Sequence, residues 1–338
     1  MSSLLKKILF SAIAIVIALL PLAPTAAMTV SPVLLDYQIA PGASRQGLAT
    51  LINDSKETKT YTLSAENFIA RGEDGEQQYL VEAQPTGLAS WIHVDQPTVT
   101  LEPGTSREFP FLIVVPPNAE PGGHYATLFF SQAGGSLGGG SGVGVAEQVG
   151  VLLLVNVPGN IHEALQVDSF RVTGPSMANR LPILFETRLK NTGSVHERPV
   201  GTITIQNGFG NVVARIPMNP TNAAILPSSI RRMASTWSAS APLRHGGFVS
   251  EIVNEWTHFG FGKYTATISA NYGAQQAHLQ GTSVSFWILP WHLMIVAAII
   301  VALLIVLISL YNQMIIRAAI AKGNTNVKQG RKRVTHRS

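Results

Sequence analysis

The chain has 338 residues, of which 46% are hydrophobic and 13% are charged, and it contains no cysteine. The missing thiols exclude disulfides, cysteine-ligated metal sites and a lipid-modified N-terminal cysteine. The formal net charge of +5 is unevenly distributed, since seven of the 24 basic residues follow Tyr311 and two are Lys6 and Lys7. Residues 28–286 hold fifteen basic and all nineteen acidic residues, a net charge of −4. A nucleic-acid partner, which needs a basic face on the folded part, is therefore not expected.

Residues 1–27 have the pattern of a signal peptide. Lys6 and Lys7 precede an apolar run over residues 8–20, and Thr25-Ala26-Ala27 offers the small residues that signal peptidase prefers. A second membrane anchor is the alternative, but the run is short for a spanning helix. Cleavage near Met28 is the preferred interpretation.

Residues 287–311 predict a transmembrane helix. The uncharged centre, residues 293–310, would span about 27 Å as a helix, close to the thickness of a bilayer's hydrocarbon core. Trp287 and Trp291 lie at one end and Tyr311 at the other, where amphipathic rings favour the headgroup layer.

The tail, residues 312–338, carries seven basic residues and no acidic one. The positive-inside rule places such a tail in the cytoplasm and the preceding residues outside. The sequence thus predicts a single-pass protein of the cell membrane with a large external part.

Residues 28–286 have an all-β pattern, with short runs of β-branched and aromatic residues broken by turn sequences. Thr202-Ile203-Thr204-Ile205 alternates into Asn207-Gly208, which is a hairpin signal. One helical insertion is expected over residues 248–259, where Val249, Ile252, Val253 and Trp256 fall at helical spacing.

Three landmarks occur twice in the same order. A strand ends at Asn53 and later at Asn191; a Leu-x-Pro or Leu-Pro turn follows at Leu101 and at Leu226; Gly-x-Tyr opens a strand at Tyr125 and at Tyr264. Two tandem immunoglobulin-like β-sandwich domains are expected, residues 28–158 and 159–286, with the boundary at Pro158-Gly159. The two asparagines are predicted as structural turn residues, and the two tyrosines as tyrosine corners that bond back to an upstream loop.

The sequence gives no support for a catalytic or metal-binding site. The nine histidines are scattered, His-Glu-x-x-His is absent, and the letters Gly-x-Ser-x-Gly occur only within the glycine-rich residues 134–144. The glycine-rich residues 134–144 lack the Lys-Ser/Thr ending of a phosphate-binding loop and are interpreted as a flexible loop. We expect a non-enzymatic protein without cofactor or metal, and an enzyme with an unrecognised site is an open alternative.

The candidate binding residues are Trp91, His124 and Tyr125. His124 and Tyr125 follow Pro121-Gly122-Gly123 and would form a rim that touches a glycan or a peptide. The structural alternative, a turn with a tyrosine corner, is favoured because both domains carry the tyrosine. Trp91 would serve as a sugar platform or, more commonly, as a core anchor.

Several strings in the first domain carry a family resemblance: Ser31-Pro32-Val33, Ala40-Pro41-Gly42, residues 51–55, 68–75, 101–104, Val115-Pro116, residues 121–125 and 150–155. This stretch resembles the N-terminal domain of bacterial WxL-interacting surface proteins, and it covers most of residues 29–157. The resemblance implies an immunoglobulin-like domain that binds peptidoglycan, followed by a second domain that binds a partner protein. Over the second domain the match is a generic pattern only.

The function predicted from these features is that of a membrane-anchored bacterial surface protein. Its ectodomain would bind peptidoglycan or another surface polymer, a partner surface protein, or both, through exposed strand edges and loops. The alternative is an accessory subunit of a membrane transport or secretion complex, against which the charge-free centre of the helix argues.

Overall fold

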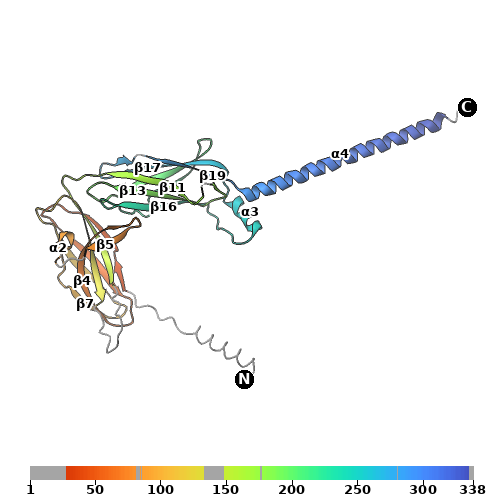
Figure 1. The fold of residues 1–338 in the computed structure, drawn as a ribbon. Coiled ribbons are helices and arrows are strands. Elements are labelled where there is room, and N and C mark those ends of the chain that lie inside the picture. The colour runs from red at the N-terminus through yellow and green to blue at the C-terminus, as the bar shows by residue number, and fades with distance from the viewer. Residues whose placement is uncertain are drawn as a thin grey trace, which may run out of the picture. The chain divides into compact units, whose positions relative to one another are not determined.

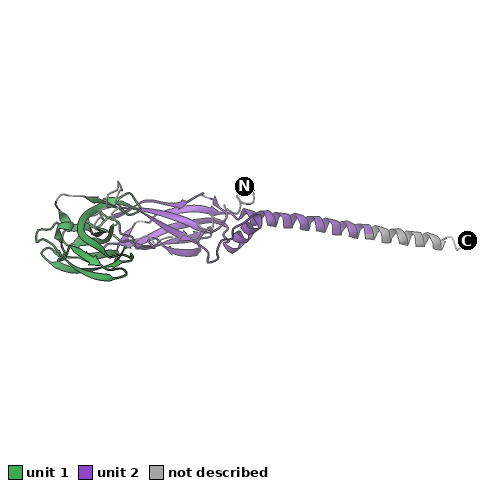
Figure 2. Cartoon of the chain, turned by 90° about the horizontal axis from the view of Figure 1, so that it is seen from below, with its two compact units in different colours: residues 1–164, 191–197, 225–231 green, residues 165–190, 198–224, 232–338 purple. Residues whose placement is uncertain are grey.

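The structure is a computed structural model that describes residues 28–80, 84, 86–132, 148–175, 177–279 and 281–334, with side chains up to Arg317. The predicted signal peptide and the predicted loop 134–144 lie outside these residues. The chain divides into two compact units (Figure 2): unit 1 is residues 1–164, 191–197 and 225–231, and unit 2 is the remainder. The predicted boundary at Pro158-Gly159 stays a prediction, and both residues lie in unit 1, directly after β10.

The first sandwich packs a sheet of order β1-β3-β8-β6 against a sheet of order β2-β10-β9-β4-β5, to which β7 adds through β4 (Figure 1). Strand β2 runs parallel to β10, whereas β9 runs antiparallel to both β10 and β4. The elements are β1 (Met28–Ser31), β2 (Leu34–Gln38), β3 (Ser44–Asn53), β4 (Lys59–Arg71), β5 (Glu76–Leu80), α2 (Gly87–Trp91), β6 (Ile92–His93), β7 (Thr98–Leu101), β8 (Ser106–Val114), β9 (Gly122–Gln132) and β10 (Gln148–Val157).

The second sandwich repeats this plan. A three-stranded sheet, β11-β13-β16, packs with a sheet of order β12-β19-β17-β14-β15, and β18 pairs with β17. Strand β12 is parallel to the last strand β19, as β2 is to β10. The elements are β11 (Leu165–Thr173), β12 (Met177–Ala178), β13 (Ile183–Asn191), β14 (Val200–Asn207), β15 (Val212–Pro217), β16 (Ile230–Trp237), α3 (Phe248–Thr257), β17 (Gly262–Tyr272), β18 (Ala277–Leu279), β19 (Ser283–Ile288) and α4 (Trp291–Val334).

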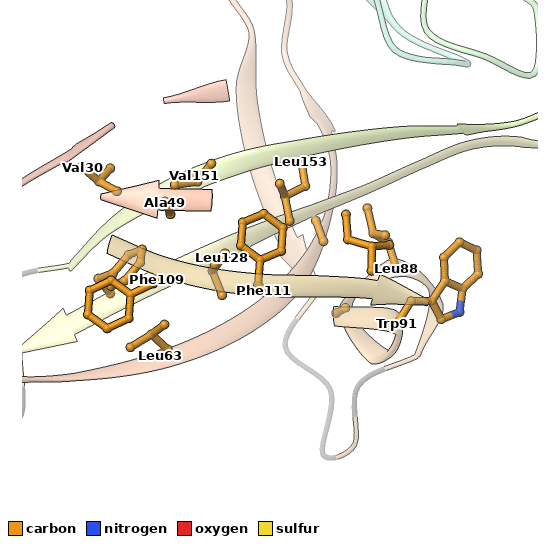
Figure 3. Packing of buried hydrophobic residues seen from close by; sticks show 14 of the residues in the cluster. Val30, Ala49, Leu63, Leu88, Trp91, Phe109, Phe111, Leu128, Val151 and Leu153 are labelled. Carbon is orange, nitrogen blue, oxygen red and sulfur yellow. The ribbon is translucent and has the colours of Figure 1, made fainter. Parts of the chain in front are cut away.

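Alternating side chains build the core of the first sandwich (Figure 3). On β8, Phe109 and Phe111 point inward, toward Leu128 of β9 and Leu153 of β10. Gly47 on the neighbouring strand makes room for Phe111, since a Cβ at that position would lie 2.2 Å from the ring. Because no disulfide can form, this packing has to hold the two sheets together.

The structure confirms the all-β class with two immunoglobulin-like sandwiches and one apolar C-terminal helix. It corrects the predicted helix start at residue 287. Trp287 and Ile288 belong to strand β19, which pairs with β17, and the helix begins at Trp291. Pro290 explains the change, because it has no N–H to extend the strand ladder and fits the entrance of a helix.

Asn53 and Asn191 occupy equivalent buried positions in the two sandwiches. The Asn53 side chain donates to the carbonyls of Glu57, Leu101 and Glu102 at 2.9, 3.0 and 3.2 Å. The Asn191 side chain donates to the carbonyls of Val195 and Ile225 at 2.7 and 2.8 Å. Each carboxamide thus connects the end of its strand to the Leu-x-Pro or Leu-Pro turn of the same sandwich.

Replacing either asparagine by alanine is expected to destabilise its sandwich. The change leaves at least two carbonyls without their donor, at a cost of about 1–3 kcal/mol for each buried group. We expect the melting temperature of the full-length chain in detergent, followed by near-UV circular dichroism, to fall by about 4 °C or more. The exposed Asn118→Ala is the matched control, and equal melting of all three variants would contradict the role of the buried carboxamides.

Candidate functional site

Trp91 and His124 are brought together at one end of the first sandwich. Trp91 ends α2 and is 8% exposed, and its ring centroid lies 4.6 Å from that of His124. The Nε2 atom of His124 is 2.9 Å from the carbonyl oxygen of Glu120. The indole belongs to the hydrophobic core, so its position is that of an anchor, and His124 is the more accessible member of the pair.

Tyr125 does not join this pair, because neighbouring side chains on a strand point to opposite faces of a sheet. Its ring packs on Phe68 at 6.0 Å, and its hydroxyl lies 3.5 Å from Nδ1 of His196. The Nε2 atom of His196 in turn lies 3.0 Å from Oδ2 of Asp36. All four residues belong to unit 1. His124 and Tyr125 therefore lie on opposite faces of the sheet and do not form the predicted rim together.

The cluster of Asp36, His196 and Tyr125 was not predicted from the sequence. Asp36 and His196 are 160 positions apart, and no local pattern links them. Burial raises the pKa of the Tyr125 phenol, which keeps its proton in place. A phenolate that takes part in proton transfer would need a lowered pKa. The cluster therefore fits a structural polar contact better than acid–base chemistry.

Tyr264 makes the contact expected of a tyrosine corner. Its hydroxyl accepts a hydrogen bond of 3.2 Å from the backbone N–H of Phe261, three residues upstream. The ring stacks on Phe286 and meets Trp237 edge-on in the core of the second sandwich. Tyr125 departs from that pattern, since its hydroxyl contact runs to a histidine side chain.

The described residues of unit 2 line grooves, of which a pair is relevant to binding. One of about 650 Å³ is lined mainly by apolar residues between β12 and the start of α4, including Leu243, Trp291 and Met294. The other, of about 380 Å³, runs beside the edge strand β11, between Leu165 and Leu279. Within the described residues, no group of three or more acidic, histidine or cysteine side chains is placed to hold a metal ion.

Strands β11 and β16 form the two edges of the three-stranded sheet and have nine and eight residues. In the first sandwich the described edge strands β1, β2, β5 and β6 have two to five residues. Short edges discourage pairing with another chain, whereas long edges permit it. The second sandwich therefore offers the better template for strand addition.

No protein-family model and no curated protein matches the chain. Solved structures with a similar fold include the class 5 fimbriae chaperone CfaA, at 14% identity and a TM-score of 0.36 over 77% of this chain and 99% of that chain. The chaperone DraB of E. coli matches at 11% and 0.34 over 77% and 96%. A chaperone–tip subunit complex from the archaic Csu pili of Acinetobacter baumannii matches at 12% and 0.33 over 77% and 98%. At these values the likeness concerns the fold and carries no argument about ligand or activity.

Tyr264→Phe is expected to lower the free energy of unfolding by about 1 kcal/mol, the value of one buried hydrogen bond. Tyr125→Phe is expected to cost less, because its hydroxyl contact is long and the ring packing remains. Thermal melting of both variants of the full-length chain checks this order. Unchanged melting of Tyr264→Phe would show that its hydroxyl bond contributes nothing.

Proposed function

We propose that the chain is a membrane-anchored, non-enzymatic surface protein whose two sandwiches bind a ligand outside the membrane. The observation that carries the proposal is helix α4. The most apolar eighteen-residue window of this helix has a mean hydropathy of 3.4 and is not buried within the protein, and the segment Trp291–Arg317 that contains it is long enough to cross a bilayer. Figure 1 shows this helix leaving the second sandwich directly after β19.

The basic tail supports an orientation with the sandwiches outside. No acidic residue follows Tyr311, whereas seven basic residues do. Positive charge beside a spanning helix favours the cytoplasmic side.

Two ligands fit the proposal, and each has its own support. Peptidoglycan is favoured by the family resemblance of the first domain, with His124 as the accessible residue to test. A partner protein is favoured by the long edge of β11 and the groove beside it, because an added strand gains main-chain hydrogen bonds while a groove receives its side chains. Tethering raises the local concentration of the sandwiches, so modest affinity at either site suffices.

Deleting residues 290–338 is expected to release the protein from membranes that have been washed with alkaline carbonate. The cut spares Ile288, which is fully buried at the end of β19. The matched control deletes residues 323–338 only, keeps the apolar segment and should stay in the membrane pellet. Retention of the longer deletion after the wash would contradict anchoring by α4.

The full-length chain in lipid nanodiscs is expected to co-sediment with insoluble peptidoglycan but not with cellulose. His124→Ala should weaken binding about fivefold, the equivalent of one hydrogen bond near 1 kcal/mol, whereas the exposed His93→Ala should leave it unchanged. Failure of the unaltered chain to sediment would exclude the wall polymer. A partner protein at the β11 edge would then be the remaining ligand class.

A further inference from the structure

Helix α3 has its polar face inside the protein and its apolar face outside. Val249 and Trp256 are each 73% exposed, while Asn254 and Glu255 are at most 1% exposed. A surface helix of a soluble domain has the reverse arrangement, with apolar residues toward the core. The exposed face of α3 is therefore suited to an apolar environment.

Hydrogen bonds explain why the polar face is buried. Asn254 bonds through its side chain to both the N–H and the carbonyl of Arg244, at 2.8 and 2.9 Å. His258 lies 2.7 Å from the carbonyl oxygen of Ala241, and Glu251 pairs with Arg180. These partners satisfy the buried groups, so the outward direction of the apolar face is fixed by the fold.

Glu255 fastens α3 to the first turn of α4. One carboxylate oxygen accepts the backbone N–H of Leu293 at 2.9 Å, and the other lies 2.6 Å from Nδ1 of His292. A carboxylate at a helix N-terminus satisfies an N–H that has no partner within the helix. Helix α3 therefore lies where the apolar helix begins, as Figure 1 also shows.

Other exposed aromatic residues gather at this end of the second sandwich. Phe209, 91% exposed, lies in the β14–β15 turn, two residues after Asn207, which pairs with Tyr264 near the start of β17. Phe259 and Phe261 precede the same strand and are also exposed. Strand register thus brings Phe209, on a separate turn, to the end of the sandwich where α3 and α4 meet.

We propose that this end of unit 2 docks into the surface of the bilayer that holds α4, with the apolar face of α3, Phe209, Phe259 and Phe261 in the headgroup–acyl boundary. The inference rests on the proposed function in one respect, that α4 spans a membrane. In this arrangement the membrane surrounds α4 and also binds the end of the second sandwich.

A lipid surface fits this patch for three reasons. The patch is continuous with the apolar helix, because Leu243, Trp291 and Met294 line one groove beside it. Aromatic rings are enriched at the boundary between headgroups and acyl chains. The acidic residues of the α3 region, Glu251 and Glu255, are both engaged in the contacts described above, so they present little negative charge to phospholipid phosphates.

Site-directed spin labelling tests the proposal without background, because the chain has no cysteine. The full-length protein carries one nitroxide, at Val249→Cys, at Val200→Cys or at Leu304→Cys, and is reconstituted into phosphatidylcholine–phosphatidylglycerol vesicles. Val200 is the matched control: it is also a valine, 72% exposed, but it pairs with Asn271 at the opposite end of β17. The rates at which each nitroxide collides with lipid-soluble oxygen and with a water-soluble nickel chelate give the depth of that label in the bilayer.

The expected result is a lipid environment for the labels at 304 and 249, the latter about 5–10 Å into the headgroup–acyl boundary, and water for the label at 200. Lipid at 304 with water at 249 would overturn docking and leave the anchor intact. Water at 304 would overturn the anchor, and the inference with it. Spin–spin broadening at 249 that disappears on dilution with unlabelled chain would assign the patch to a second copy and also overturn lipid docking.

Discussion

The apolar surface of α4 constrains the rest of unit 2. The segment Trp291–Arg317 contains an eighteen-residue window with a mean hydropathy of 3.4 and no burial within the protein. Exposing this window to water is unfavourable, since each exposed aliphatic side chain forgoes roughly 1.5–3 kcal/mol of burial. Once this segment is placed in a bilayer, the end of the sandwich from which it leaves lies at the lipid surface. The composition of that end, with Phe209 and Phe261 exposed, is then consistent with its surroundings.

Glu255 shows how a buried charge can serve this arrangement. Removing a carboxylate from water is costly, and the cost is offset only where the geometry supplies strong partners. Here the partners are the N-terminal turn of α4 and the ring of His292. The same contact adds to the bonds of Asn254 and His258 that keep the polar side of α3 inward, so Glu255 links the orientation of α3 to the start of α4.

Neither sandwich contains a disulfide, and both contain the same kind of buried asparagine contact. Asn53 and Asn191 each bond backbone carbonyls of a turn that is distant in sequence, where an extracellular domain often has a covalent link. In the core, Phe111 and its glycine neighbour pack across adjacent strands. Stability therefore rests on packing and on buried carboxamides, neither of which depends on the redox state of the compartment.

The sequence by itself determined the β class, the repeat and the apolar helix, because alternation, turn residues and hydropathy are local properties that survive without tertiary contacts. The spacing of Val249 and Trp256 also showed that α3 has two faces. Only the tertiary structure decided which face is covered, because Arg244 and Ala241 supply the bonds that draw the polar side inward. The same holds for His196 beside Asp36, which meet because the fold joins positions that the chain separates by 160 residues.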